Sequence, residues 1–189
     1  MVELKEIFEA LERREEITRL VRYDPETSKL SLAGITVAPM HDYFLPAVFA
    51  ALEKQIGPVA RTLIIRYARK VGSRDGEILR KTFFQDRPPT IEEVERLTRS
   101  FLGMWCQVGW GKIVKFQIGK DHAYLVRSTS YEGEGYLKLG GGPAKTPRCW
   151  IALGYVIGVF EGLLDRSVEG EEVECLGKGD QTCTFKLKW

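Results

Sequence analysis

The sequence predicts an α+β fold in which an antiparallel sheet packs against helices, preceded by an N-terminal helix and hairpin. Helical patterns occur in runs, and strand patterns occur in pairs joined by short turns. The strict strand–helix–strand alternation that is typical of a parallel sheet is missing from the sequence. The chain has 189 residues, of which 44% are hydrophobic. This is enough apolar material for the core of one domain of ordinary size.

The first 38 residues are expected to form an appendage, and residues 39–189 to form the main domain. A helix is predicted at 3–16, because apolar side chains recur there at the spacing of one helical face. These side chains are Leu4, Ile7, Phe8 and Leu11. Two extended segments follow near 17–24 and 29–38. The Asp-Pro-Glu-Thr-Ser cluster between them has the chemistry of a turn, so the two segments predict a hairpin.

Four helices are predicted in the first half of the main domain, separated by glycines and prolines. Their ranges are 42–56, 58–71, 75–84 and 91–108. Gly72 and Gly76 mark the break between the second and the third helix, because glycine is unfavourable inside a helix. Thr90 stands three residues before Glu93, which is the spacing of a capping box at the start of the fourth helix.

Two strand pairs and one long helix are predicted in the second half. Apolar and polar residues alternate on a strand near 114–118 and on its partner at 121–129. A glycine-rich loop is expected at 132–146. The last helix begins near Pro147, since proline is favoured at a first helical position, and runs to about Leu164. The chain ends in a hairpin with strands at 168–175 and 182–188.

Composition and charge exclude several classes of function. The formal net charge is +2 and the basic residues are interleaved with glutamate, so no basic surface for nucleic acid is expected. The most apolar segment, Trp150–Phe160, is too short to span a bilayer, and the N-terminus lacks the features of a targeting signal. We therefore expect a cytoplasmic protein. The sequence has no asparagine, which is typical of thermophile proteins but also of a bias in amino-acid usage.

The strongest chemical signal is a set of four residues near the C-terminus with the spacing C-x22-E-x2-C-x7-C. They are Cys149, Glu172, Cys175 and Cys183. Zinc binds thiolates and carboxylates in tetrahedral geometry, and four protein ligands close such a site, which is then structural. The site would tie the start of the last helix to the terminal hairpin. Two alternatives stay open: Glu171 or Glu174 supplies the carboxylate, or the cysteines are buried as small hydrophobic residues without a metal.

The segment from Cys149 to Cys183, with E-x2-C followed by G-K-G-D-x2-C-x-F, resembles the 4-vinyl reductase domain. This family includes predicted archaeal hydrocarbon-binding proteins and the sensor half of phenol- and toluene-responsive activators. Its fold is shared with the TRAPP Golgi-tethering subunits and with nitric-oxide-type haem sensors. The resemblance covers roughly residues 40–189. It implies a structural zinc ion on the four residues above, a ligand pocket between helices and sheet, and a homodimer.

The activators continue into an ATPase and a DNA-binding domain, whereas this sequence stops at Trp189. A sensor of this kind is expected to signal through a partner protein, and the alternative is a domain that only binds and carries its ligand. The ligand itself, including whether it is a tetrapyrrole, is not identified by the resemblance.

Seven residues are predicted to line the pocket, which needs mostly apolar walls and a few polar groups. They are Phe101, Trp105, Tyr124, Val126, Ser128, Leu153 and Ile157. Ordinary core packing is the alternative for each of them. Cys106 is expected to be a buried thiol, with a reactive or acylated cysteine as the alternative. The glycines at 154, 158 and 162 recur on one helical face, where close approach of another backbone or of a ligand would explain them.

These observations together predict a zinc-stabilised domain that binds or senses a small apolar or aromatic molecule and performs no catalysis. The first alternative is an enzyme or carrier in tetrapyrrole metabolism, but no dinucleotide or flavin fingerprint supplies the hydride that a reductase needs. The second alternative is a protein-interaction scaffold.

Overall fold

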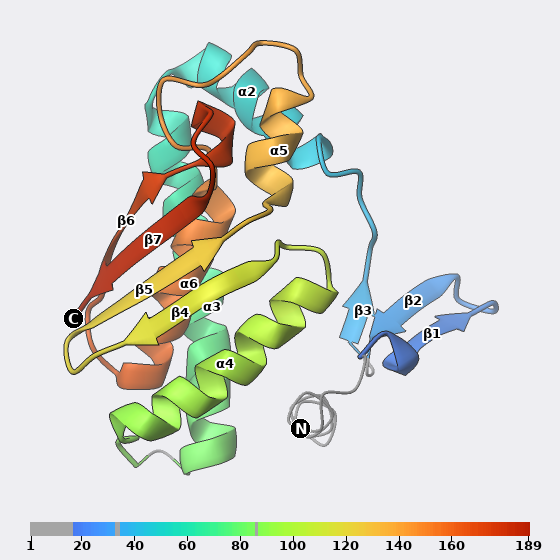
Figure 1. The fold of residues 1–189 in the computed structure, drawn as a ribbon. Coiled ribbons are helices and arrows are strands. Elements are labelled where there is room, and N and C mark those ends of the chain that lie inside the picture. Colours follow the sequence, from blue (N-terminus) through green and yellow to red (C-terminus); the bar gives the residue numbers. More distant parts are fainter. Residues whose placement is uncertain (1–16, 33–34, 86) are drawn as a thin grey trace.

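The computed structural model describes residues 17–32, 35–85 and 87–189, and within these ranges the chain forms an α+β fold with two antiparallel sheets (Figure 1). The predicted fold class is confirmed. The helix predicted at 3–16 lies outside the described residues.

The larger sheet has four antiparallel strands in the order β4-β5-β7-β6. Their bounds are Ile113–Ile118 (β4), His122–Arg127 (β5), Glu169–Glu174 (β6) and Cys183–Lys188 (β7). Successive side chains of a strand point to opposite faces of a sheet. On β5 the side chains of Ala123, Leu125 and Arg127 are buried, while those between them are more exposed. One face of this sheet therefore belongs to the core.

Helices cover that inner face. In Figure 1, α4 (Ile91–Gln107) runs beside β4, α6 (Trp150–Leu164) lies behind the sheet, and α3 (Val59–Phe84) packs on α6. Most residues of α6 are buried, as expected for a helix that is apolar on every side. Thr90 and Glu93 form the predicted capping box at the start of α4.

A single helix, α3, replaces the two helices predicted at 58–71 and 75–84. Gly72 and Gly76 lie inside it and face α6, whose own glycines face back. A Cβ atom on Gly158 would lie 2.6 Å from the backbone nitrogen of Ser73, and real Cβ atoms essentially never come this close. The glycines that predicted a helix break are therefore contact positions, where two helix backbones approach one another.

A short helix, α5 (Tyr131–Leu137), occupies part of the predicted loop at 132–146. It begins at Ser130, whose hydroxyl accepts the backbone N–H of Gly133 at 3.2 Å. The glycines in this segment again serve packing, because a Cβ atom on Gly135 would lie 2.9 Å from the carbonyl carbon of Asp42. Its glycine content therefore predicted a loop where tertiary packing forms a helix.

The N-terminal hairpin is a three-stranded sheet in the structure. Its strands are Val21–Asp24 (β1), Lys29–Leu32 (β2) and Ile35–Val37 (β3), and the 3-10 helix Ile17–Leu20 (η1) precedes them. A connection leads from β3 to α2 (Phe44–Ile56). The strands of this sheet pair only with one another among the described residues. The division of the chain at residue 38 stays a prediction. No helix of the described part of the chain is long and apolar enough to cross a membrane.

Replacement of Gly158 by alanine is expected to lower the free energy of unfolding by at least about 2 kcal/mol, because the added methyl group forces α3 and α6 apart. Chemical denaturation measures this change. Gly141→Ala is the matched control, since Gly141 has open space around it and no positive φ. Equal stability of the two variants would contradict the close backbone contact between the helices.

Candidate metal centre

Four buried side chains converge where the start of α6 meets the β6–β7 hairpin. Cys149 directly precedes α6, and Glu172 lies on β6. Cys175 follows β6, and Cys183 begins β7. Their potential ligand atoms all lie within 4.8 Å of one another. The three cysteines are fully buried and Glu172 is 6% exposed. The structure thus brings together the four residues that the sequence predicted as a group.

The chain between the strands aims two of the cysteines at one point. After Cys175 it forms a 3-10 turn, η2 (Leu176–Lys178), and Gly179 then adopts a positive φ of 91°. The carboxylate of Asp180 accepts the backbone N–H of Cys175 at 2.8 Å, which fixes the start of this turn. The G-K-G-D sequence therefore folds back so that Cys183 comes next to Cys175.

A register shift on β6 decides which glutamate joins the cysteines. Glu172 and Glu174 would share one face of a regular strand, but the pairing with β7 shifts between them. Glu172 is buried, whereas Glu174 is exposed and accepts hydrogen bonds from the hydroxyls of Thr182 and Thr184. Glu171 is also exposed and borders the outer face of the sheet. Of the three glutamates considered, Glu172 is therefore the one whose carboxylate lies with the three cysteines.

The distances between the sulfur atoms fit a tetrahedral ion. Sγ of Cys149 lies 3.4 Å from Sγ of Cys183 and 4.0 Å from Sγ of Cys175. Two thiolate sulfurs bound to one tetrahedral zinc ion lie roughly 3.8 Å apart, as follows from Zn–S bonds of about 2.3 Å. All three cysteines are free thiols. The spacing is compatible with three sulfurs around one metal ion and is too long for a disulfide bond.

Polar groups around the cluster leave one oxygen without a partner. Glu172 accepts the backbone N–H of Cys149 through Oε2 at 3.0 Å, but its buried Oε1 has no hydrogen-bond partner. The backbone N–H groups of Arg148 and Leu176 donate to the sulfurs of Cys175 and Cys183 at 3.2 and 3.3 Å. Donors of this kind stabilise thiolates, and a buried oxygen with no partner is costly unless it binds a cation. Both the N–H groups that donate to the sulfurs and the unpartnered oxygen of Glu172 therefore fit a zinc ion at this site.

Burial and hydrogen bonding shift the pKa values of these groups in opposite directions. It raises the pKa of Cys149 well above its ordinary value and, together with the charge of Cys175, raises the pKa of Glu172 to about 8. Hydrogen bonds from Cys149 and Cys175 lower the pKa of Cys183 to about 4. Four adjacent acidic groups cannot all carry a negative charge in the core unless a cation lies among them.

Two further buried charged residues were missed by the sequence analysis. Arg127 ends β5 and is completely buried. Glu132 is 1% exposed, and its carboxylate accepts the backbone N–H groups of Ile151 and Ala152 in the first turn of α6 at 2.8 and 2.9 Å. Burial raises the pKa of Glu132 to about 8. The alternation along β5 contained the signal for Arg127, because it shares a face with Ala123 and Leu125.

The seven predicted pocket residues do not lie in one place. Phe101, Trp105, Leu153 and Ile157 are buried in the core between helices and sheet. Tyr124 and Val126 lie on β5 between its buried positions, so they face away from α6, and Ser128 follows the strand. Four of the seven residues therefore lie in the core and three do not, since alternation along a strand defines two faces without saying which one is inside. The role of these residues in ligand binding stays a prediction.

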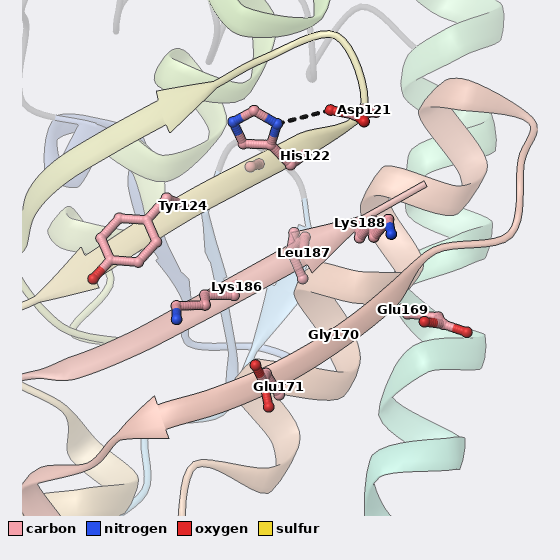
Figure 2. A pocket seen from close by; sticks show the side chains of 10 residues that line it. Asp121, His122, Tyr124, Glu169, Gly170, Glu171, Lys186, Leu187 and Lys188 are labelled. Carbon is pink, nitrogen blue, oxygen red and sulfur yellow. Dashed lines mark hydrogen bonds and ion pairs between the residues drawn. The ribbon is translucent and has the colours of Figure 1, made fainter.

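Tyr124 instead borders a groove on the outer face of the sheet, with a volume of about 620 Å³ (Figure 2). Figure 2 shows that charged side chains from β6 and β7 line it beside Tyr124, among them Glu171 and Lys186. Apolar ligands prefer enclosed, mostly apolar sites. An open groove with lysine and glutamate side chains does not match the pocket that the family resemblance implies.

Trp105 belongs to a cluster of aromatic rings near the C-terminal end of α4. Its ring centroid lies 4.6 Å from that of Trp110 and 5.6 Å from that of Tyr155. Tyr155 also stacks on Phe101 at 6.0 Å. Cys106, expected to be buried, is exposed, and its sulfur accepts the backbone N–H of Ile113 at 3.4 Å. The correction arises because Cys106 stands beside the buried stripe of α4 rather than on it.

Solved structures share the fold. The phenol-responsive sensory domain of the transcription activator PoxR, solved with phenol, aligns with a TM-score of 0.73 at 22% identity, covering 95% of this chain and 88% of that one. A trafficking protein particle complex subunit 3 from Naegleria fowleri, covalently bound to palmitic acid, aligns with a TM-score of 0.51 at 14% identity, covering 78% and 93%. An H-NOX protein from S. oneidensis aligns with a TM-score of 0.50 at 10% identity, covering 82% and 78%.

Among curated proteins, none matches the sequence. The family model of the 4-vinyl reductase domain matches residues 134–189, a segment that contains all four members of the cysteine–glutamate cluster. The resemblance to the 4-vinyl reductase domain family is thus confirmed, and residues 134–189 are the part of the chain that carries it.

Proposed function

We propose that this chain is a zinc-stabilised domain that binds or senses a small apolar or aromatic molecule without transforming it. The observation that carries the metal part is the buried cluster of three thiols and one carboxyl group with ligand atoms within 4.8 Å of one another. The binding part is supported by the match to the 4-vinyl reductase domain and by the fold shared with the PoxR sensory domain.

Zinc suits this donor set better than the other common divalent ions. Thiolates are soft ligands that select zinc over magnesium or calcium, which prefer six or more oxygen atoms. Cys149, Cys175, Cys183 and Glu172 would fill all four tetrahedral positions. No position would remain for a reactive water, so the ion supplies cross-linking rather than Lewis-acid catalysis. The cross-link joins the start of α6 to both strands of the terminal hairpin.

An apolar or aromatic ligand is proposed because a cluster of aromatic rings lies beside α6. The rings of Phe101, Trp105, Trp110 and Tyr155 gather where α4 and α6 meet. Aromatic rings favour flat or apolar guests through stacking and burial of area. Two proteins of the same fold hold molecules of this class, phenol in one structure and palmitic acid in another. The ligand-binding role of Phe101, Trp105, Leu153 and Ile157 stays part of this proposal.

A second copy of this chain is the partner that we propose for an exposed apolar face on α2 and α3. This apolar face consists of Phe44, Val48, Leu52, Ile56, Val59, Leu63, Tyr67 and Val71, each at least 37% exposed. The residues recur every three or four positions, so they form one stripe on each helix.

Eight large apolar side chains exposed on two successive helices are more than a monomeric protein usually leaves in contact with water. A homodimer related by a two-fold axis uses the same surface on both copies, so one apolar face is enough to build it. Signalling through a further partner protein would then use another surface.

The metal proposal predicts about one zinc ion per purified chain, measured by elemental analysis. Glu172→Ala is expected to lose most of the zinc and to melt at a lower temperature, because one of four ligands is gone. Glu171→Ala is the matched control, since this neighbouring glutamate is exposed and lies outside the cluster. Equal loss of zinc in both variants, or a wild-type protein that contains no metal, would refute the site.

The binding proposal predicts that phenol or a related aromatic molecule raises the melting temperature in a dose-dependent way. A ligand present at one hundred times its dissociation constant stabilises the folded state by about 2.7 kcal/mol. Trp105→Ala is expected to weaken the effect if the aromatic cluster holds the ligand, whereas Tyr124→Ala, on the outer face, leaves it unchanged. A broad screen of apolar compounds without any stabilising member would count against binding.

The dimer proposal predicts that the protein sediments as a dimer and that Leu63→Asp converts it to a monomer. The substituted carboxylate would be buried without a partner at the centre of the interface, which costs several kcal/mol. Val114→Asp serves as the control, because Val114 is 53% exposed on β4 and lies outside the apolar face. A monomeric wild-type protein at micromolar concentration would overturn this assignment.

A further inference from the structure

Arg127 stands next to the proposed zinc site on the inner face of the sheet. It ends β5, and the residue opposite it on β7 is Cys183. Directly opposite residues of an antiparallel pair have their side chains on the same face, roughly 5 Å apart at Cβ. Both residues are 0% exposed. The guanidinium group is therefore enclosed in the core beside one of the proposed ligands.

The hydrogen bonds of Arg127 are incomplete. Nη1 donates to the backbone carbonyl oxygen of Trp110 at 3.1 Å, but the buried Nε and Nη2 have no hydrogen-bond partner. The group also lies over the ring of Phe185, with 4.7 Å from Cζ to the ring centroid. Within the described residues, no carboxylate oxygen lies within ion-pair distance of it. The backbone and the ring alone leave this cation without a counter-charge.

A buried guanidinium without a counter-charge is expensive, because transfer of an isolated ion into the core costs several kcal/mol even after relaxation. Burial alone would lower the pKa of Arg127, yet the negative charges of Cys149 and Cys183, followed by those of Glu132 and Glu172, hold it above its ordinary value. The two largest contributions thus come from cysteines of the cluster.

The charges of the loaded centre provide that counter-charge. Three thiolates and one carboxylate carry four negative charges, and a divalent ion leaves the centre with a net charge of −2. The first turn of α6 contributes partial positive charge, but Glu132 already occupies two of its N–H groups. A full positive charge close to Cys183 is therefore favourable for the loaded centre.

We propose that Arg127 is the internal counter-cation of the metal centre, a positioning residue that stabilises the anionic, zinc-loaded cluster through its charge. This inference rests on the proposed zinc site. Coupling between two groups is reciprocal, so zinc in turn stabilises the buried Arg127. The cost of burying Arg127 is therefore offset most fully in the loaded protein, in which all four ligand groups are ionised.

The experiment compares Arg127→Met, which keeps an unbranched apolar side chain and removes the charge, with Arg127→Lys, which keeps the charge. Competition with a chelator is expected to show at least a tenfold higher zinc dissociation constant for Arg127→Met, and partial rescue by Arg127→Lys. Removal of the charge is expected to lower the melting temperature more in the zinc-loaded protein than in the metal-free protein. Arg99→Met is the control, since Arg99 is a half-exposed arginine that bonds Glu95.

Two results would overturn the inference while leaving the zinc site intact. One is an unchanged zinc affinity in Arg127→Met. The other is an equal loss of melting temperature with and without zinc, which is the signature of a packing role alone. A wild-type protein without zinc refutes the metal proposal itself. If the metal-free protein does not fold, zinc retention is compared between Arg127→Met and Arg127→Lys, and equal retention overturns the role of charge.

Discussion

The convergence of four acidic side chains at the start of α6 is the constraint on which the C-terminal half of the molecule depends. Three thiols and one carboxyl group occupy a site from which water is almost completely excluded. Such a site is stable when a cation binds among the four groups, and costly when the groups only face one another. The ion would fix where α6 begins relative to the β6–β7 hairpin, and so the orientation of the helix that fills the core.

Backbone packing then fixes the other side of α6. Glycines on α3 and α6 let the two helices approach more closely than any side chain would permit. Each glycine costs roughly 0.8–1.0 kcal/mol of helix propensity relative to alanine, and the close contact along the helices offsets this cost. The same arrangement turns the opposite side of α3 outward, where Leu63 and Tyr67 remain exposed. The part of the apolar face on α3 thus lies on the side of this helix that points away from α6.

Local signals made much of this fold predictable. The capping box of Thr90 and Glu93, the alternation on β5 and the turn before Cys183 each depend on a few neighbouring residues, and each appears in the structure. On β4 a register shift between Ile113 and Lys115 breaks the predicted alternation and leaves Val114 exposed. The grouping of the cysteines followed from the hairpin and the family motif. The features that the sequence did not predict depend on contacts between elements that are distant in the sequence. Gly72 lies inside a helix because α6 faces it, and no sequence window around Gly72 contains that fact.

The burial of Arg127 shows why the choice of strand face failed. On β5 the sequence H-A-Y-L-V-R offers two alternating sets, and Tyr124 with Val126 looks as apolar as Ala123 with Leu125. The set that faces the core ends in Arg127, and arginine is a residue that is rarely fully buried. That arginine is nevertheless inside, beside a cluster that becomes strongly anionic once its thiols are deprotonated. The polarity of a strand face thus depends on the charge of the site that it meets, and that site is assembled from residues more than twenty positions away.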